Sequence, residues 1–407
     1  MRKLLHRLRD QSGVLKLSAL LIPLSIAPVA AVTPVVKDEY HAFVDRFAPR
    51  APKAAPKLKI DPAELAKWRP LPEYDGAVPV LLYHGINNSH DHYSVTRKQF
   101  AEQMLMLKRA NFKTITVDEY LRFLKGDRTG LPIRPILITF DGGRWDSYQG
   151  ADAVLARYGY TAAISVIAGE IGHGPFYPDW NELRRMRASG RWDIELEAGL
   201  GAVNIRAGAK DDKRPFYANL RVFGNGRRET FAGYRRRVTS DIDMGISLLR
   251  SQLPGWRPQV MALPFGDYGQ LGPNDGRIAP FLRNWLHTRF QALLLQGQPV
   301  FSVAGMGEVD RYQVISRTTA DQLYTWLRHG LAYNAWTPRE QRLSADLVLK
   351  PLREQLFERL DQCARAVHGT RQYLICQRHA SIARRAWRTK QKELRVSADG
   401  IALEVSG

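Results

Sequence analysis

The stretch that decides the fold is Ile136-Leu137-Ile138-Thr139-Phe140-Asp141-Gly142-Gly143. It is a continuous apolar run that ends abruptly in Asp-Gly-Gly. A short apolar run bounded by turn residues is typical of a buried strand. In α/β barrels the residues that carry out chemistry lie at the carboxyl ends of such strands. We therefore predict a strand over residues 135–140 that presents Asp141 as a candidate active-site carboxylate.

Strand-like and helix-like segments alternate on both sides of this stretch. Strands are predicted at residues 78–84, 112–117, 135–140, 161–167, 192–197, 260–263 and 292–295. Helices are predicted at residues 96–110, 118–125, 151–158, 180–189 and 228–253. This alternation favours an α/β fold in which helices cover a parallel sheet that is closed, or nearly closed, into a barrel.

Four candidate site positions fall at the ends of predicted strands. They are His84, Asp141, Glu197 and the segment 264–268. Because the carboxyl ends of parallel strands meet at one end of a barrel, we expect these positions to converge on one face.

The chain carries a large positive charge. It has 407 residues, with 60 Lys and Arg against 40 Asp and Glu, and a net charge of +20. Such a protein attracts polyanions, which include anionic cell-wall polymers, the lipid head groups of a membrane surface and nucleic acid. The sequence contains no nucleic-acid-binding motif, so nucleic acid is not an expected partner.

Both ends of the chain differ from the alternating region. Residues 1–36 join a basic flank to an apolar run, which predicts a signal peptide or, if it is not cleaved, a membrane anchor. Residues 37–74 form a Pro/Ala/Lys-rich linker, residues 75–334 the alternating domain, and residues 335–407 a small basic α+β appendage. We therefore expect an extracytoplasmic protein, either secreted or membrane-anchored.

The C-terminal region contains the two cysteines of the chain, Cys363 and Cys376. In an exported protein two cysteines this close favour a disulfide, with two free thiols as the alternative. A helix is predicted at 352–367, a strand at 372–376 and a hairpin over 394–405.

Several segments, taken in order, resemble the polysaccharide deacetylase (NodB-homology) family, carbohydrate esterase family 4, and within it the poly-β-1,6-N-acetylglucosamine deacetylases. The resemblance covers residues 75–330. It rests on Val80-Leu81-Leu82-Tyr83-His84, residues 100–124, residues 135–143, Ser189-Gly190-Arg191-Trp192-Asp193-Ile194 and Leu263-Pro264-Phe265-Gly266-Asp267-Tyr268. It implies a deformed (β/α) barrel that hydrolyses N-acetyl groups on a polysaccharide.

The resemblance also implies metal-dependent chemistry. A divalent metal such as zinc polarises the amide carbonyl and lowers the pKa of a bound water to about 7. A catalytic zinc typically has three protein ligands and one open position. In the family the three ligands are an aspartate and two histidines, and a neighbouring aspartate acts as the general base.

This sequence departs from the family pattern at every ligand position. Asp141 matches the base, but Gly142 stands where the metal-binding aspartate is expected. The first histidine position falls at Glu197, and the second at Gly201 or Ala202. We therefore assign no metal ligands, although the family implies zinc.

Other family positions are altered or ambiguous. The arginine that often precedes the Pro-aromatic motif is replaced by Ala262. The segment Leu327-Arg328-His329 spells the family's acid motif but lies in a helix-like region, so we assign it no role.

The remaining candidates each have a structural interpretation beside a functional one. Asp141 is a catalytic base or merely caps its turn, and Glu197 is a second catalytic group or a solvated charge at a strand end. We assign His84 and the segment that follows residue 263 to substrate binding, through sugar stacking or hydrogen bonding. The residues of that segment are Pro264, Phe265, Gly266, Asp267 and Tyr268.

Three functions remain open. The first is a deacetylase-like protein that acts on or binds N-acetylated cell-surface or extracellular polysaccharide without the standard metal-dependent catalysis. The second is an active carbohydrate hydrolase with a rebuilt site that uses Asp141 and Glu197, either with a metal or as paired carboxylates. The third is a membrane-tethered interaction protein that binds anionic polymers through its basic surface.

Overall fold

The structure, a computed structural model, describes residues 52–71, 76–88, 91–209, 212–297 and 301–334. The predicted signal or anchor segment 1–36 lies outside these residues, as do Cys363, Cys376 and the C-terminal region 335–407. Within the described ranges, the structure contains no helix that is both long and apolar enough to cross a membrane.

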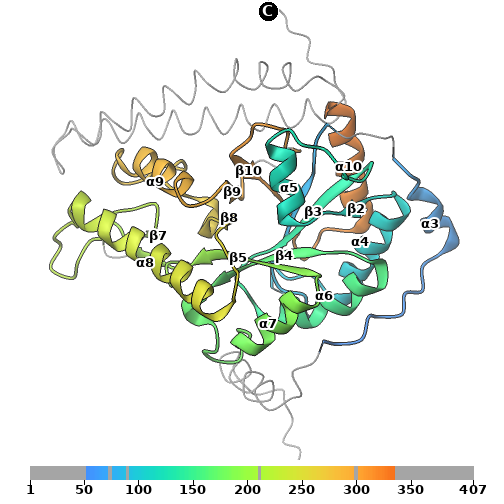
Figure 1. Cartoon of the computed structure of the whole chain (residues 1–407), viewed down its shortest axis with the longest axis horizontal. Coiled ribbons are helices and arrows are strands. Elements are labelled where there is room, and N and C mark those ends of the chain that lie inside the picture. The colour runs from blue at the N-terminus through green and yellow to red at the C-terminus, as the bar shows by residue number, and fades with distance from the viewer. Residues whose placement is uncertain (1–51, 72–75, 89–90, 210–211, 298–300, 335–407) are drawn as a thin grey trace, which may run out of the picture. The chain divides into compact units, whose positions relative to one another are not determined.

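A nine-stranded parallel sheet forms the centre of the described residues (Figure 1). Its spatial order is β10-β9-β8-β5-β4-β3-β1-β11, and β2 pairs with the start of β3. The strands are β1 (Val80–Tyr83), β2 (Lys113–Thr114), β3 (Pro135–Phe140), β4 (Ala162–Ile167), β5 (Trp192–Ala198), β8 (Val260–Ala262), β9 (Ala292–Leu295), β10 (Glu308–Asp310) and β11 (Tyr312–Gln313). A separate antiparallel hairpin is formed by β6 (Asn204–Arg206) and β7 (Lys213–Pro215).

One continuous segment, residues 308–313, joins the two edges of this sheet. Its first half, β10, pairs with β9, and its second half, β11, pairs with β1. Arg311 is the residue between the two halves. The sheet is therefore nearly closed into a barrel, and the prediction of a deformed (β/α) barrel is confirmed.

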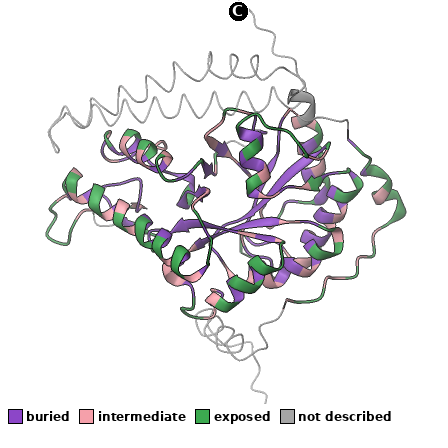
Figure 2. Ribbon diagram, in the orientation of Figure 1, coloured by how far each residue is buried: buried purple, intermediate pink, exposed green. Residues whose placement is uncertain are grey.

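Helices surround the strands (Figure 1). The strands are buried almost throughout, whereas the outward helix surfaces are exposed (Figure 2). This explains why the strands appear in the sequence as continuous apolar runs, because a parallel sheet is covered on both faces. The helices are α3 (Pro62–Lys67), α4 (Arg97–Arg109), α5 (Val117–Leu124), α6 (Trp145–Tyr158), α7 (Trp180–Ala188), α8 (Phe231–Gln252), α9 (Ile278–His287) and α10 (Ala320–Asn334).

Alternate residues of β3 belong to different apolar clusters. Ile136, Ile138 and Phe140 lie in the cluster that includes the surrounding helices. Leu137 lies in a second cluster, built largely from the other strands. Since side chains alternate along a strand, Asp141 extends from β3 on the side of Leu137.

The predicted helix 151–158 is wrong at its start, because α6 begins at Trp145, directly after the Asp-Gly-Gly turn. Gly142 and Gly143 have φ values of 86° and 58°, and this left-handed turn leads the chain straight from strand to helix. Gly150 lies within α6 because a Cβ at this position would be 2.2 Å from the carbonyl oxygen of Ile86. This close packing requires a glycine inside α6, at the position where the sequence predicted the start of the helix.

The predicted strand 112–117 is also too long, since β2 spans only Lys113–Thr114. Thr116 instead forms a capping box with Glu119, in which each side chain accepts a hydrogen bond from the other residue's backbone N–H. This cap starts α5 at Val117, one residue before the predicted helix 118–125.

Part of the predicted linker 37–74 packs against the barrel and is not a free connection between two regions. Residues 62–67 form α3, and Trp68 and Leu71 are buried in the main apolar cluster. The Trp68 indole N–H donates a hydrogen bond to the Asp321 carboxylate at 2.6 Å. Burial of a tryptophan and a leucine explains why this short segment is fixed to the domain.

Candidate functional site at the carboxyl ends of the strands

Asp141 and Glu197 lie next to each other at the carboxyl ends of β3 and β5. The backbone N–H of Gly142 donates a hydrogen bond to Glu197 Oε2 at 2.5 Å. Gln296, which follows β9, donates from its side-chain amide to Asp141 Oδ2 at 3.3 Å. His84 follows β1, and the charge of Asp141 acts on its pKa. The structure therefore brings the candidate carboxylates together, with His84 within electrostatic range.

Arg311 binds both oxygens of the Asp141 carboxylate. Its two terminal nitrogens donate to Oδ1 at 2.7 Å and to Oδ2 at 2.6 Å. The same guanidinium donates to Thr139 Oγ1 and to the carbonyl oxygen of Leu295, both at 3.1 Å. The Arg311 side chain is 0% exposed and that of Asp141 is 2% exposed. A bidentate, charge-assisted pair at this depth fixes the carboxylate rigidly.

The sequence interpretation missed Arg311. The resemblance implies an arginine just before the Pro-aromatic motif, where this chain has Ala262. Arg311 comes instead from the segment 308–313, and Val309, two residues earlier, is fully buried. An arginine two positions from a buried valine in an alternating segment was the available signal for an inward-facing charge.

Glu197 is buried and is not the solvated charge that was considered as one interpretation. The residue is only 7% exposed. Burial, followed by the neighbouring charge of Asp141, raises the pKa of Glu197 from 4.5 to about 8, against the lowering effects of the Gly142 N–H and Arg311. At neutral pH Glu197 therefore carries a proton for most of the time.

The loop after β5 is held by a carboxylate from α8. The backbone N–H groups of Gly199, Leu200 and Gly201 all donate to Asp241, at 3.0, 2.9 and 3.2 Å. The Tyr217 hydroxyl donates to the same carboxylate. A Cβ on Gly201 would lie 2.7 Å from the Tyr217 ring and 2.9 Å from an Asp241 oxygen. The space that a longer side chain at position 201 would need is therefore filled.

Gly142 and Gly143 differ in the room around them. A Cβ at Gly143 would lie 2.8 Å from the Val166 Cα, so no side chain fits there. A Cβ at Gly142 would meet only the Arg144 side chain, at 3.4 Å, although the φ of 86° remains unfavourable for a residue with a Cβ. Position 142 thus has space for a side chain, but its backbone is shaped for glycine.

His84 has a buried ring nitrogen without a hydrogen-bond partner. Among the described residues, no group bonds to its Nδ1 atom. Burial is the largest influence on its pKa and lowers it, while Asp141 acts in the opposite direction. The ring lies 5.5 Å from that of Tyr93, centroid to centroid. A neutral imidazole with an unpaired nitrogen is available to a ligand that reaches this position.

The Pro-aromatic segment has one exposed member. Phe265 is 44% exposed and has a φ of 60°, a backbone conformation that bulky residues rarely adopt. Pro264 and Gly266 are buried, Asp267 accepts the N–H of Gly269, and the Tyr268 hydroxyl donates to Glu308. Of this predicted substrate-binding set, the structure leaves Phe265 as the side chain that is open to a ligand.

Further exposed hydrophobic side chains occupy the loops at the same end of the barrel. They follow β1, β4, β5 and β8, and apart from Phe265 the sequence interpretation did not select them. They are Tyr93, Phe176, Leu200, Val203 and Phe265. Apolar surface on several neighbouring loops is typical of a ligand-binding face.

The side chains present do not fit the zinc site of the family. Across the described ranges, no three His, Cys, Asp or Glu residues come close enough to hold a metal together. The expected ligand positions hold Gly142, Glu197 in place of a histidine, and a Gly201 without space for a side chain. Instead, the groups at these positions form hydrogen bonds within the protein. The Gly142 N–H donates to Glu197, and the Gly201 N–H donates to Asp241.

Comparisons with known proteins give sequence relatives for part of the chain. No protein-family model matches it. YxkH of Bacillus subtilis, which carries the name of a polysaccharide deacetylase, is 36% identical over 101 residues. The poly-β-1,6-N-acetyl-D-glucosamine N-deacetylase of Staphylococcus aureus is 31% identical over 107 residues. Each match covers 25% of this chain and 36% of the relative, so the chain matches about a third of the length of these relatives.

Solved structures share the fold over a longer stretch. A de-N-acetylase from Aggregatibacter actinomycetemcomitans superposes with a TM-score of 0.54 at 18% identity, over 60% of this chain and 98% of that one. IcaB from Ammonifex degensii gives a TM-score of 0.50 at 24% identity, over 62% of this chain and 97% of that one. At these identities the superpositions establish the barrel fold alone. The sequence matches and the shared barrel together make this chain similar to polysaccharide deacetylases.

Proposed function

We propose that this protein binds N-acetylated polysaccharide at the carboxyl ends of its barrel strands and lacks the metal-dependent hydrolysis of its family. The observation that carries the proposal is the filled position 201, where Tyr217 and Asp241 occupy the space of the expected ligand. Gly142 has no side chain that could bind a metal, and Glu197, which stands in place of a histidine, accepts the Gly142 N–H. A catalytic zinc needs about three such ligands.

The exposed side chains of the strand-end loops support binding. Phe265 and Tyr93 present aromatic surface, on which the apolar face of a sugar ring can stack. His84 adds an unpaired ring nitrogen for a hydroxyl or an amide group. The Staphylococcus aureus relative is named for poly-β-1,6-N-acetyl-D-glucosamine, so β-1,6-linked N-acetylglucosamine is the first glycan to test.

Titration with β-1,6-linked N-acetylglucosamine oligomers tests the binding proposal. We expect saturable binding that Phe265→Ala weakens about fivefold, as for the loss of one aromatic contact worth about 1 kcal/mol. Ile133→Ala is the matched control, because Ile133 is an exposed apolar residue just before β3, at the opposite end of that strand. Absence of binding, or equal weakening by both variants, would contradict the proposal.

A second candidate function is metal-free hydrolysis by Asp141 and Glu197. The observation in its favour is the raised pKa of Glu197, about 8, beside the Arg311-bound Asp141. A protonated and an ionised carboxyl group side by side supply the acid and the base of a glycosidase. New reducing ends released from a polysaccharide, and lost in Glu197→Gln, would establish this function in place of binding alone.

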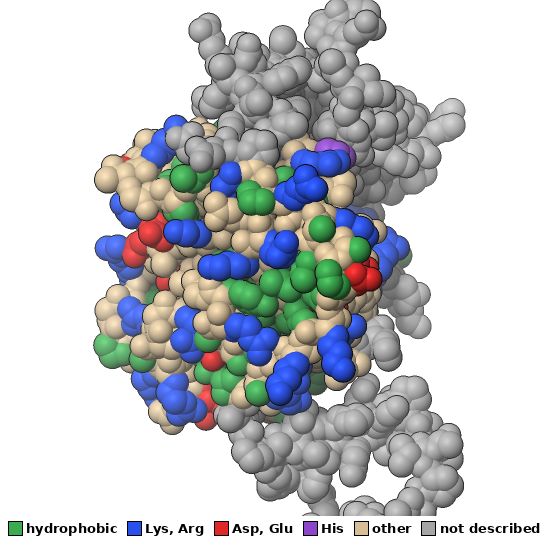
Figure 3. Space-filling view, turned by 90° about the vertical axis from the view of Figure 1, so that its right-hand side faces the viewer, with side chains coloured by type: hydrophobic (Ala, Val, Ile, Leu, Met, Phe, Trp, Pro, Cys, Tyr) green, Lys and Arg blue, Asp and Glu red, His purple; other side chains and the backbone are tan. Residues whose placement is uncertain are grey.

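We also propose that the protein is exported, with a signal or anchor segment at residues 1–36, the barrel domain over residues 75–334 and a separate C-terminal region at residues 335–407. Basic side chains are spread widely over one face of the molecule, whereas acidic ones are few (Figure 3). Such a surface suits contact with anionic polymers or lipid head groups outside the cytoplasm. Fractionation of cells that express the full chain tests export. If the protein binds only anionic polymers, and only at low salt, a tethered interaction protein becomes the better description.

A further inference from the structure

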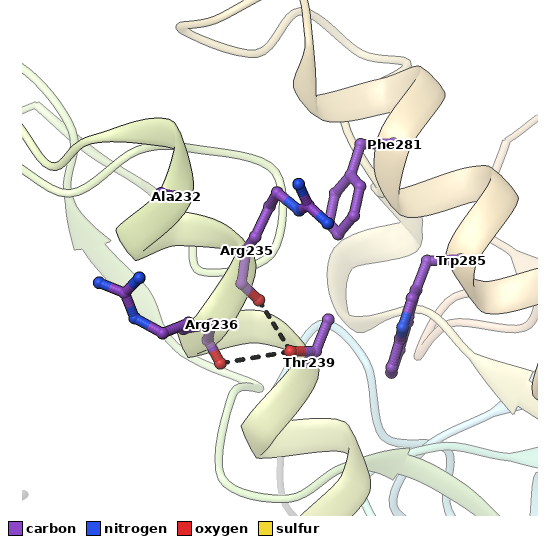
Figure 4. Close-up of a pocket in the computed structure, with 6 residues that line it drawn as sticks. All are labelled: Ala232, Arg235, Arg236, Thr239, Phe281 and Trp285. Atoms are coloured by element: carbon purple, nitrogen blue, oxygen red, sulfur yellow. Dashed lines mark hydrogen bonds between the residues drawn. The ribbon is translucent and has the colours of Figure 1, made fainter.

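A pocket of about 340 Å³ lies between α8 and α9, outside the strand-end site (Figure 4). Its volume is at the lower end of the range of about 300–1,000 Å³ found for small-molecule sites, which suits one or two ring-sized groups. The residues from α8 recur at a spacing of three or four, and those from α9 are four apart, so each set shares one helix face. The lining residues are Ala232, Arg235, Arg236, Thr239, Phe281 and Trp285.

Two aromatic side chains form one wall of this pocket (Figure 4). Phe281 is held edge-on by Phe231 and Tyr234, with ring centroids 5.7 and 6.2 Å away. Trp285 is half-buried and has the Arg289 guanidinium 5.0 Å from its ring. Packing thus positions both rings before a ligand arrives. They offer the flat apolar surface against which the C–H groups of a sugar ring pack.

Two arginines give the pocket its charge. The Arg235 guanidinium lies 4.9 Å from the Phe281 ring centroid, whereas that of Arg236 points away from both aromatic rings (Figure 4). Within the described part of the chain, neither guanidinium forms an ion pair with a carboxylate. Asp243, about two turns further along α8, is already paired with Arg289 at 3.5 Å. The local excess of positive charge therefore favours a ligand with an anionic group.

Thr239 supplies a hydrogen-bond acceptor rather than a donor. Its hydroxyl proton is used by the Arg235 carbonyl oxygen, at 2.9 Å, so the lone pairs of the hydroxyl remain for a ligand. A ligand that matches the pocket has a flat apolar face, a planar anion and a hydroxyl donor. Inorganic phosphate has no apolar face, and a neutral sugar has no anion.

We propose that the pocket between α8 and α9 binds a carboxylated sugar unit, a hexuronate, of an acidic polysaccharide. The ring stacks against Trp285, the carboxylate pairs with Arg235, whose guanidinium lies over the Phe281 ring, and a ring hydroxyl donates to Thr239. Arg236, at the open side, adds long-range attraction. This site is separate from the strand-end site and does not depend on the function proposed for that site.

Calorimetric titration of the full chain with a hexuronate trisaccharide tests the proposal. We expect saturable binding, with Kd increased about tenfold in Arg235→Gln and in Trp285→Ala, and increased less in Arg235→Lys, which keeps the charge. Arg250→Gln is the matched control, because it removes the same charge from an exposed site at the far end of α8. It should change Kd less than about twofold.

Several outcomes would overturn the proposal. They are no binding of the trisaccharide, an equal loss in Arg250→Gln, equal affinity for the N-acetylglucosamine trisaccharide, and displacement by inorganic phosphate at equal concentration. If Trp285→Ala proves unfolded by circular dichroism, Arg235→Gln decides alone, because Arg235 is exposed. Phe265→Ala should leave hexuronate affinity unchanged, so failure here and failure at the strand-end site can be told apart.

Discussion

Arg311 donates hydrogen bonds to both carboxylate oxygens of Asp141. This ion pair links the carboxyl end of β3 to residues 308–313, the segment that pairs with both edges of the sheet. The two residues are 170 positions apart in the chain and are both fully buried. Their ion pair is therefore part of the candidate site and also holds the segment 308–313 against β3.

Removal of the arginine should destabilise the protein strongly. Arg311→Met leaves the Asp141 carboxylate buried without a counter-charge, so we expect a loss of about 3–5 kcal/mol in the free energy of unfolding by urea. The double variant with Asp141→Asn should lose less than the sum of the two single variants, because the charge left unpaired is then absent. Arg250→Met, on an exposed part of α8, should change stability by less than about 0.5 kcal/mol. Additive losses would contradict a direct pair.

The pH dependence of stability should report the protonation of Glu197. Its pKa is raised in the folded protein, from 4.5 to about 8, so the folded state binds more protons than the unfolded state between these values. Stability therefore decreases as pH rises through this window and levels off above it. In Glu197→Gln this decrease should be smaller. Urea unfolding at pH 5, 6, 7 and 8 measures the difference between the two proteins, and identical slopes would show that Glu197 is not perturbed.

The Asp-Gly-Gly turn should tolerate no side chain at its second glycine. In Gly143→Ala the new methyl group would lie 2.8 Å from the Val166 Cα, in addition to the cost of a φ of 58°. Gly226→Ala controls for the backbone alone, since Gly226 has a φ of 79° and no atoms within 4 Å of the Cβ position. We expect thermal unfolding to show a loss of about 1 kcal/mol in the control. Gly143→Ala should lose about 1–3 kcal/mol more, as for overpacking.

Asp241 should be needed to hold the loop after β5. Asp241→Ala removes the acceptor of three backbone N–H groups and of the Tyr217 hydroxyl. We expect a loss of about 2–4 kcal/mol and faster hydrogen exchange at residues 199–201. Asp243→Ala, two positions along α8 in an exposed ion pair, should cost less than about 0.5 kcal/mol. Unchanged exchange in Asp241→Ala would contradict the role of this carboxylate.

The sequence predicted the parts of the fold that depend on local pattern. Apolar runs such as 135–140 appear as strands in the structure because each is buried on both faces. Errors arose where a local contact overrides the pattern. Thr116 ends β2 by capping α5, and Gly150 lies inside α6 because it packs on Ile86. Both effects depend on neighbours that the pattern of one segment does not contain.

The candidate site was predictable only in part, for a related reason. Asp141 and Glu197 occupy strand ends, which the sequence pattern locates. Arg311 contacts Asp141 from the segment between β10 and β11, and Asp241 contacts Gly201 from the middle of α8. No spacing in the sequence relates the members of either pair. The burial of Glu197 likewise depends on how the barrel closes around it.

The most direct test is the zinc content of the purified full chain, measured together with acetate release from β-1,6-linked N-acetylglucosamine oligomers. The filled position 201 and the glycine at position 142 predict far less than one zinc per chain and no acetate above that of a sample without protein, while the oligomers still bind. One tightly held zinc per chain, together with acetate release that a chelator abolishes, would contradict the proposed loss of metal-dependent hydrolysis.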